Sequence, residues 1–182
     1  MLNVDLLRDQ PVLRGDRVML TQLDESFFDE AWAALGDEES RRFTHTHAEF
    51  TPEQVREFMR TRPRQEDRAD WAILVGDRYV GEVVLMDLDP DNESIEFRIA
   101  LAGPQAFGRG YGTEAVRLVL EFAFERLRVH RVGLDVADYN PRARRVYEKC
   151  GFVVEGVHRD AILWEGKRYD SVLMSVLATD PR

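Results

Sequence analysis

Several features that mark other classes of protein are scarce or missing in this sequence. Cys150 is the only cysteine among 182 residues, which excludes intrachain disulfides and thiolate metal clusters. The longest uninterrupted apolar runs, at residues 31–35 and 71–75, are far shorter than the roughly 18 residues that a transmembrane helix needs. Charges are mixed into the first ten residues, with no basic segment followed by an apolar one, so no secretory signal is expected. We therefore expect a cytoplasmic protein with no membrane partner.

Basic residues are also fewer than acidic residues. The chain has 25 basic and 34 acidic residues and a formal net charge of −9. This balance opposes binding to nucleic acid, which depends on a dense surface of Lys and Arg, and it suits a cationic partner better. Hydrophobic residues make up 44% of the sequence, enough for a packed core. The length predicts a single domain over residues 1–182.

Helices are predicted by periodicity and by capping residues. Apolar residues at helical spacing indicate helices over residues 27–35 and from 110 to about 128. Thr51 and Gln54 form a capping box around Pro52, so a helix is expected from there to about residue 62. A fourth helix should open at Asn140 and end at Gly151.

Strands are predicted where apolar and polar residues alternate or where a short apolar run is bounded by turn residues. These segments are residues 17–23, 71–75, 79–87, 95–101, 131–137 and parts of 152–177. The three strands between residues 71 and 101 follow one another through short turns and should be antiparallel. We expect an α+β fold with a mainly antiparallel, mixed sheet of about seven strands and about four helices.

The most informative segment is a glycine-rich loop, Phe107-Gly108-Arg109-Gly110-Tyr111-Gly112-Thr113. Alternating glycines let backbone N–H groups approach an anion, and the loop opens onto a helix N-terminus, whose dipole favours negative charge. The loop is therefore a candidate phosphate site, to which Arg109 adds a cation. The alternative is a tight turn without a ligand.

Two better-known phosphate motifs do not fit this loop. A nucleoside-triphosphate loop requires Gly-Lys followed by Ser or Thr, which does not occur in the sequence. A dinucleotide fingerprint requires a third glycine where Thr113 stands, inside a parallel βαβ unit. A nicotinamide-dependent enzyme therefore stays only as a minor alternative.

A second segment, about 30 residues later, narrows the interpretation of the glycine-rich loop. It runs Asn140-Pro141-Arg142-Ala143-Arg144-Arg145-Val146-Tyr147-Glu148-Lys149-Cys150-Gly151-Phe152. Together the two segments resemble the GNAT N-acetyltransferase superfamily, whose acetyl-CoA motif has the form Gln/Arg-x-x-Gly-x-Gly/Ala and whose later helix carries Asn-x-x-Ala/Ser and Tyr-Glu-Lys-x-Gly-Phe. The resemblance covers about residues 71–177. Glu155-Gly156, Arg159, Gly166 and Asp170 resemble the branch that contains ribosomal-protein alanine N-acetyltransferases and spermidine N-acetyltransferases.

The resemblance implies a single GNAT-like domain in which two central strands splay apart to admit acetyl-CoA. The backbone amides of the glycine loop would bind the pyrophosphate, and the pantetheine arm would pair with main chain between the splayed strands. The first motif position, often Gln or Arg in the family, is Phe107, which removes a polar contact but leaves the backbone cradle. The residues implied in coenzyme binding are Phe107, Gly108, Arg109, Gly110, Tyr111, Gly112, Thr113, Ile99, Ala100, Leu101, Asn140 and Arg145.

Two of these residues have an equally simple structural interpretation. Asn140 is a good helix N-cap, worth about 1 kcal/mol, and in the family the matching Asn also contacts the coenzyme arm. Arg145, with Arg142 and Arg144, either meets the CoA phosphates or forms a solvated helix face.

Catalysis in the family is a direct transfer, without a covalent enzyme intermediate. The matching Tyr of the family, here Tyr147, protonates the departing thiolate, a step that a phenol can perform; the alternative is a half-buried helix aromatic. Glu96 resembles the strand carboxylate that some relatives use as a base, and it is otherwise an exposed strand residue.

The sequence therefore predicts an acetyl-CoA-dependent N-acetyltransferase acting on a primary amine, either a protein N-terminus or a small polyamine-like molecule. The alternative is a catalytically inactive module that binds acyl-CoA as a sensor or partner. A homodimer is compatible with the resemblance. His45 and His47 lack a third ligand nearby in the sequence, so no metal is expected.

Overall fold

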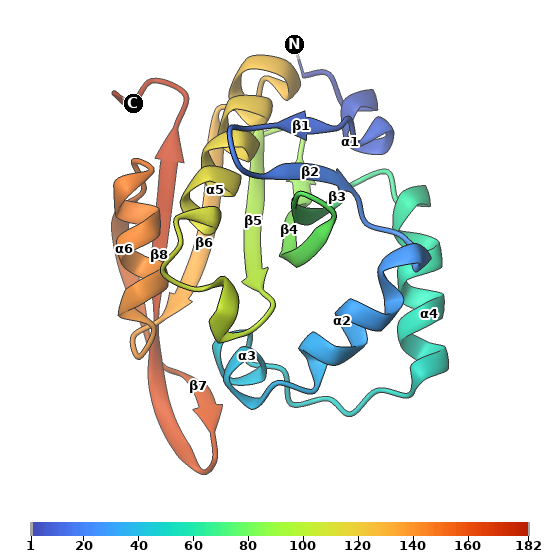
Figure 1. Ribbon diagram of the computed structural model, residues 1–182. Coiled ribbons are helices and arrows are strands. Elements are labelled where there is room, and N and C mark those ends of the chain that lie inside the picture. The colour runs from blue at the N-terminus through green and yellow to red at the C-terminus, as the bar shows by residue number, and fades with distance from the viewer. Residues whose placement is uncertain (1, 182) are drawn as a thin grey trace.

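The computed structural model describes residues 2–181, in which one eight-stranded sheet lies between helices on its two faces (Figure 1). The strands are β1 (Leu13–Arg14), β2 (Met19–Gln22), β3 (Ala69–Val75), β4 (Arg78–Asp89), β5 (Ser94–Leu101), β6 (Arg131–Ala137), β7 (Val153–Trp164) and β8 (Lys167–Leu177). The α-helices are α1 (Asp5–Asp9), α2 (Phe28–Leu35), α3 (Glu38–Phe43), α4 (Pro52–Thr61), α5 (Tyr111–Glu121) and α6 (Pro141–Lys149). Shorter turns of helix are η1 (Glu25–Phe27), η2 (Arg62–Arg64), η3 (Pro104–Ala106) and η4 (Phe122–Leu127). None of the helices in this part of the chain has the length and apolar character needed to cross a bilayer.

The strand order is β1-β2-β3-β4-β5-β6-β8-β7. Every neighbouring pair is antiparallel except β5 and β6, which are parallel and are joined by the crossover through α5. The predicted series of antiparallel strands between residues 71 and 101 is confirmed. The α+β class and the mixed, mainly antiparallel sheet are confirmed as well.

The counts of elements were too low. The sheet has eight strands rather than about seven, and residues 2–181 contain six α-helices rather than about four. The missed helices α1 and α3 have five and six residues, too few to show an apolar period. In α3, the carboxylate of Asp37 accepts a hydrogen bond from the amide of Ser40, so local capping defines this helix.

Helix α4 begins as its sequence predicted. The Thr51 side chain accepts from the amide of Gln54, the Gln54 side chain accepts from the amide of Thr51, and Pro52 stands at the first helical position. This capping box satisfies backbone donors that a helix N-terminus otherwise leaves free.

The period of two along the strands divides the sheet into two faces. Trp71 and Ile73 belong to the core cluster that includes Ala115 and Val119 of α5. The alternate residues of β3, including Ala72, belong to a second cluster with α2 and α4. Helix α5 therefore packs on one face of the sheet, and α2 and α4 pack on the other.

The central strands separate, as the family resemblance implied. Strands β5 and β6 pair only at Ser94 with Arg131, Ile95 with Val132 and Glu96 with Gly133. Beyond this point β5 stays paired with β4, and β6 stays paired with β8. Residues 97–101 and 134–137 therefore face one another across a gap, which is visible in Figure 1 as the divergence of β5 and β6 toward their C-terminal ends.

Candidate active site

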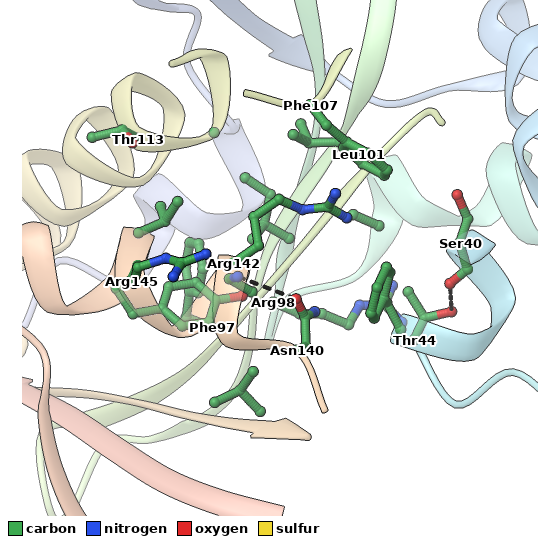
Figure 2. A pocket seen from close by; sticks show the side chains of 18 of the residues that line it. Ser40, Thr44, Phe97, Arg98, Leu101, Phe107, Thr113, Asn140, Arg142 and Arg145 are labelled. Atoms are coloured by element: carbon green, nitrogen blue, oxygen red, sulfur yellow. Dashed lines mark hydrogen bonds between the residues drawn. The ribbon is translucent and has the colours of Figure 1, made fainter. Parts of the chain in front are cut away.

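A cavity of about 580 Å³ opens where β5 and β6 diverge, next to the N-termini of α5 and α6 (Figure 2). This volume lies in the range of sites that hold a cofactor-sized ligand. Most residues singled out from the sequence line it: Glu96, Ile99, Ala100, Leu101, Phe107, Gly108, Gly110, Gly112, Thr113, Asn140, Arg145 and Tyr147. Two residues of the glycine loop, Arg109 and Tyr111, lie outside this lining.

The glycine loop has the backbone geometry of an anion cradle. Gly108 and Gly110 have φ values of 68° and 81°, in the left-handed region that favours glycine. Gly110 is also the N-cap of α5 and supplies no capping side chain. Within residues 2–181, the amides of Gly108, Arg109 and Gly110 donate no backbone hydrogen bond. They stand free beside a helix N-terminus, where the helix dipole adds to their attraction for an anion.

The loop is held from outside by Arg17, which the sequence analysis did not single out. The Arg17 guanidinium donates to the carbonyl of Arg109 at 2.8 Å and forms an ion pair with Glu114 at 3.1 Å. Burial alone would raise the pKa of Glu114, but hydrogen bonds from the amides of Arg17 and Val18 and from the Arg17 side chain lower it. Glu114 therefore stays charged and ties the first turn of α5 to the β1–β2 turn.

Arg109 and Tyr111 contribute differently from their neighbours. The Nε of Arg109 donates to the carbonyl of Gln105 at 2.7 Å. The Tyr111 ring lies 5.7 Å from the Arg17 guanidinium carbon. In this structure their side chains stabilise the loop, and their backbone amides remain part of it.

Asn140 caps α6 at the edge of the cavity. Its Oδ1 accepts from the amide of Ala143 at 3.1 Å (Figure 2), which confirms the capping role. The residue is 9% exposed and lines the cavity. Because the cap uses the carbonyl oxygen, the amide nitrogen is left to donate to a ligand.

The arginines at the start of α6 fall into separate environments. Arg144 pairs with Glu148 at 2.9 Å and so forms part of the outer helix face. Arg142 and Arg145 line the cavity. The guanidinium of Arg142 lies 3.7 Å from the centre of the Phe107 ring (Figure 2) and forms an ion pair with Glu39 of α3 at 3.6 Å.

Tyr147 lies two helical turns after Asn140. Its ring packs edge-on against the Phe97 ring, with 6.2 Å between the ring centres, and in a tilted arrangement against the Phe152 ring, with 5.8 Å between the centres. Burial, reinforced by the charge of Asp135, raises the pKa of the phenol well above its ordinary value, so the phenol stays protonated. Tyr147 lines the cavity, and none of the hydrogen bonds between residues 2 and 181 involves its hydroxyl. The arrangement leaves a proton donor available to a ligand.

Glu96 lies at the closed end of the gap. Loss of water around its carboxyl raises its pKa, against the opposing charge of Arg131. A Cβ at the facing Gly133 would lie 2.5 Å from its Oε1, so the space for this carboxylate depends on glycine. The raised pKa brings Glu96 closer to the value at which a carboxylate works as a base near neutral pH.

One further lining residue was missed from the sequence. Asp135 of β6 stands in the same alternation as Gly133 and lines the cavity. It has no sequence signal, because its position depends on how β6 meets β5. His45, which the sequence analysis considered together with His47, also lines the cavity, has φ of 53°, and has a buried Nε2 without a hydrogen-bond partner.

The other candidate chemistries find no support in the described residues. Cys150 is buried, and its Sγ lies 3.7 Å from the carbonyl oxygen of Thr113. Burial raises the pKa of this thiol, so it is an inert packing group. Between residues 2 and 181, no three His, Cys, Asp or Glu side chains are grouped in a way that could hold a metal ion.

Comparison with known proteins gives a consistent family. A family model described as "Acetyltransferase (GNAT) domain" matches residues 17–153. The chain is 32% identical over 114 residues to a spermidine N(1)-acetyltransferase of Vibrio cholerae, an alignment that covers 61% of this chain and 65% of that relative, a little under two thirds of its length. It is 25% identical over 172 residues to the uncharacterized N-acetyltransferase YoaA of Bacillus subtilis, covering 92% of this chain and 97% of the relative.

A solved structure shows the same fold. The spermidine N-acetyltransferase from Vibrio cholerae, in complex with CoA and spermine, superimposes with a TM-score of 0.84 at 21% identity, over 91% of this chain and 98% of that chain. At this level of identity the likeness extends to the fold.

Proposed function

Because this chain belongs to the GNAT family of acetyltransferases, we propose that it binds acetyl-CoA between β5 and β6 and transfers the acetyl group directly to a primary amine. The observation that carries the proposal is that one cavity joins the free amides of the glycine loop to the unpaired strand edges and to Tyr147. A phosphate, an extended amide-bearing arm and a thioester have complementary partners in that order.

The residues present fit a coenzyme with these three parts. Amides from Gly108 to Thr113 would hold the pyrophosphate, with Arg145 at the same cavity as a cation. Main-chain groups of residues 99–101 would pair with the pantetheine amides as a strand does. Asn140 would donate from its free amide nitrogen. Bound acetyl-CoA would supply the activated thioester, and all other roles belong to the chain.

The proton balance assigns roles to Glu96 and Tyr147. Glu96 would accept the proton of the amine, whose nitrogen forms the new C–N bond as the C–S bond breaks. Tyr147 would donate to the departing sulfur. Because the raised pKa keeps the phenol protonated, a hydrogen bond to the developing thiolate would precede full proton transfer.

The acceptor class is either a protein N-terminal amine or a polyamine-like molecule. An alkyl amine with a pKa near 10.4 is less than about a thousandth neutral at pH 7, so it depends on a base more strongly than an α-amine with a pKa near 8. The raised pKa of Glu96 and a relative named as a spermidine acetyltransferase favour the polyamine-like class.

Two measurements on the whole chain test the proposal. In thermal unfolding, CoA and acetyl-CoA should raise Tm, whereas NAD and NADP should not, because a ligand that binds the native state stabilises it by mass action. Thiol release from acetyl-CoA should then depend on an acceptor from a panel of polyamines, N-terminal peptides and aminoglycosides. Binding of CoA without turnover on any acceptor would instead indicate an inactive acyl-CoA-binding module. Stabilisation by NADP and not by CoA would refute both the acetyltransferase and the acyl-CoA-binding module.

A further inference from the structure

We propose that Asp135 sets the acceptor specificity of this site by binding a second cationic group of the amine acceptor. The inference rests on the proposed acetyl transfer and narrows its acceptor to a small amine that carries at least two positive charges. It is based on the distribution of charge around the cavity.

Asp135 is accessible from the cavity and is fixed in direction. It lies on β6 in the stretch that has separated from β5, on the face opposite Leu134 and Val136, which belong to the core beside α5 and α6. Its Oδ2 accepts from the hydroxyl of Ser171 on β8 at 2.9 Å, and Ser171 is 5% exposed. Since that bond occupies one oxygen, Oδ1 remains available to a ligand.

The cavity is divided electrostatically into two sides. Three of its four cations, Arg142, Arg145 and Lys149, come from α6, next to the glycine loop, and the fourth, Arg98 of β5, is paired with Glu82 at 3.1 Å. Its carboxylates Asp87, Glu96 and Asp135 come from β4, β5 and β6. Within residues 2–181, these three carboxylates form no salt bridge with Lys or Arg, because Arg98 is paired with Glu82 and Arg131 with Glu155.

Asp135 is central on the acidic side. Its charge acts on Glu96 of β5, on Tyr147 of α6 and on His45 of the segment after α3. Loss of water lowers the pKa of His45 despite that charge, so the imidazole is not a counter-ion. The three elements that surround the reacting position therefore leave Asp135 uncompensated.

Asp87 adds a third carboxylate to the acidic side of the cavity, at an irregularity in the pairing of β4. The pairing of β4 with β5 shifts between Met86 and Asp89, and Asp87 has φ of 55°. A left-handed conformation at a residue other than glycine costs about 1–2 kcal/mol. Bulges beside active sites commonly redirect a side chain, and this one directs a carboxylate-bearing residue to the cavity.

Charge balance then defines the acceptor. The reacting nitrogen must give up its proton before it attacks, and Glu96 would take that proton. Asp135 and Asp87 take no part in that proton transfer, so a monoamine would leave both carboxylates without a cationic partner. A second ammonium group on the acceptor would compensate them and would keep all of its protons through the reaction, which makes it a binding group.

The test compares two amines of equal length, 1,5-diaminopentane and pentylamine, with purified full-length protein. The wild type should prefer the diamine in kcat/KM by at least about tenfold, the lower range for a hydrogen bond to a charged group. Asp135→Asn should raise the KM for the diamine by about tenfold, bring the ratio of kcat/KM between the two amines close to one, and leave the KM for acetyl-CoA within twofold. Asp138→Asn is the matched control, because it removes the same charge from an exposed residue outside the cavity lining, and it should keep the preference.

A binding measurement separates this inference from the proposed function. Calorimetric titration of 1,5-diaminopentane into the protein–CoA complex requires no turnover, and Asp135→Asn should weaken the Kd by about tenfold. Absence of turnover together with this weakening would refute the acetyl transfer and support the role of Asp135. An unchanged Kd in Asp135→Asn, no binding to the wild type, or an equal loss in Asp138→Asn would overturn the inference.

Discussion

Side chains in this site combine a structural contact with a free functional group. Asn140 caps α6 with its side-chain oxygen, and its side-chain nitrogen is left to donate to a ligand. Asp135 accepts a hydrogen bond from Ser171 on one carboxylate oxygen, and its other oxygen is left to accept from a ligand. Tyr147 is positioned through its ring, by Phe97 and Phe152, so its hydroxyl is not needed for packing. Removing a free group should therefore alter chemistry more than folding.

Tyr147→Phe tests this separation. We expect kcat to fall at least about a hundredfold, in the range of general acid catalysis, because the variant loses the proton donor and keeps the ring contacts. The Kd for CoA, measured by titration, should change by less than about twofold. Equal turnover in the variant would remove Tyr147 from the mechanism.

Glu96→Gln tests the base through pH. Because burial raises the pKa of Glu96, its deprotonated form, and hence activity, should be lost in the wild type as pH falls, at a higher pH than for a free carboxyl. The variant lacks the base, so its deficit in kcat should be largest below neutral pH and should shrink toward pH 9, where more of the amine is already neutral. A deficit that is constant from pH 6 to pH 9 would indicate a structural role.

At the scale of elements, the glycine loop and α5 act as one unit. The loop conformation depends on left-handed glycines and on the contact of Arg17 with both the Arg109 carbonyl and Glu114. The motif was visible in the sequence because glycine spacing is a local property. Its support by Arg17 was not, because that residue lies 92 positions earlier in the chain.

Gly110→Ala should therefore disrupt coenzyme binding. The new Cβ would lie 2.7 Å from Nη2 of Arg17, at a φ of 81°, so both the backbone and its anchor must move. We expect the Kd for CoA to weaken by at least about tenfold in calorimetric titration.

Gly166→Ala is the matched control for backbone strain. Gly166 has φ of 77° in the β7–β8 turn, and a Cβ there meets nothing within 4 Å. This variant should lose about 1–2 kcal/mol of unfolding free energy and keep the Kd for CoA. Equal weakening of CoA binding in both variants would show that strain, rather than the cradle, is responsible.

At the scale of the whole molecule, the sheet consists of two parts that meet along a short parallel pairing. Strands β1–β5 form one antiparallel series and β6–β8 form the other, and only the residue pairs from Ser94–Arg131 to Glu96–Gly133 join them. A ligand that adds main-chain bonds in the gap would connect the two series.

Hydrogen exchange tests that connection. With CoA bound, amides of residues 97–101 and 134–137 that face the gap should exchange more slowly, because they gain a partner or lose contact with water. Amides of β3, in the centre of the first series, should change little. Protection confined to the glycine loop would show that the gap does not hold the coenzyme arm.

The sequence by itself determined the fold class, the antiparallel series, the capped helices and the glycine loop, because each depends on residues close together in the chain. Even the caps at Thr51 and Asn140 were predictable from short motifs. The short elements β1, α1 and α3 were not predictable, because a segment of two to six residues is too short to show a periodic pattern of apolar residues. Only the tertiary structure decided that Gly133 makes room for Glu96, that Arg17 anchors the loop and that Asp135 faces the cavity. The positions of Gly133 and Asp135 depend on how β5 and β6 meet and diverge, and that of Arg17 on how the β1–β2 turn meets α5, so all three relations join residues that lie far apart in the sequence.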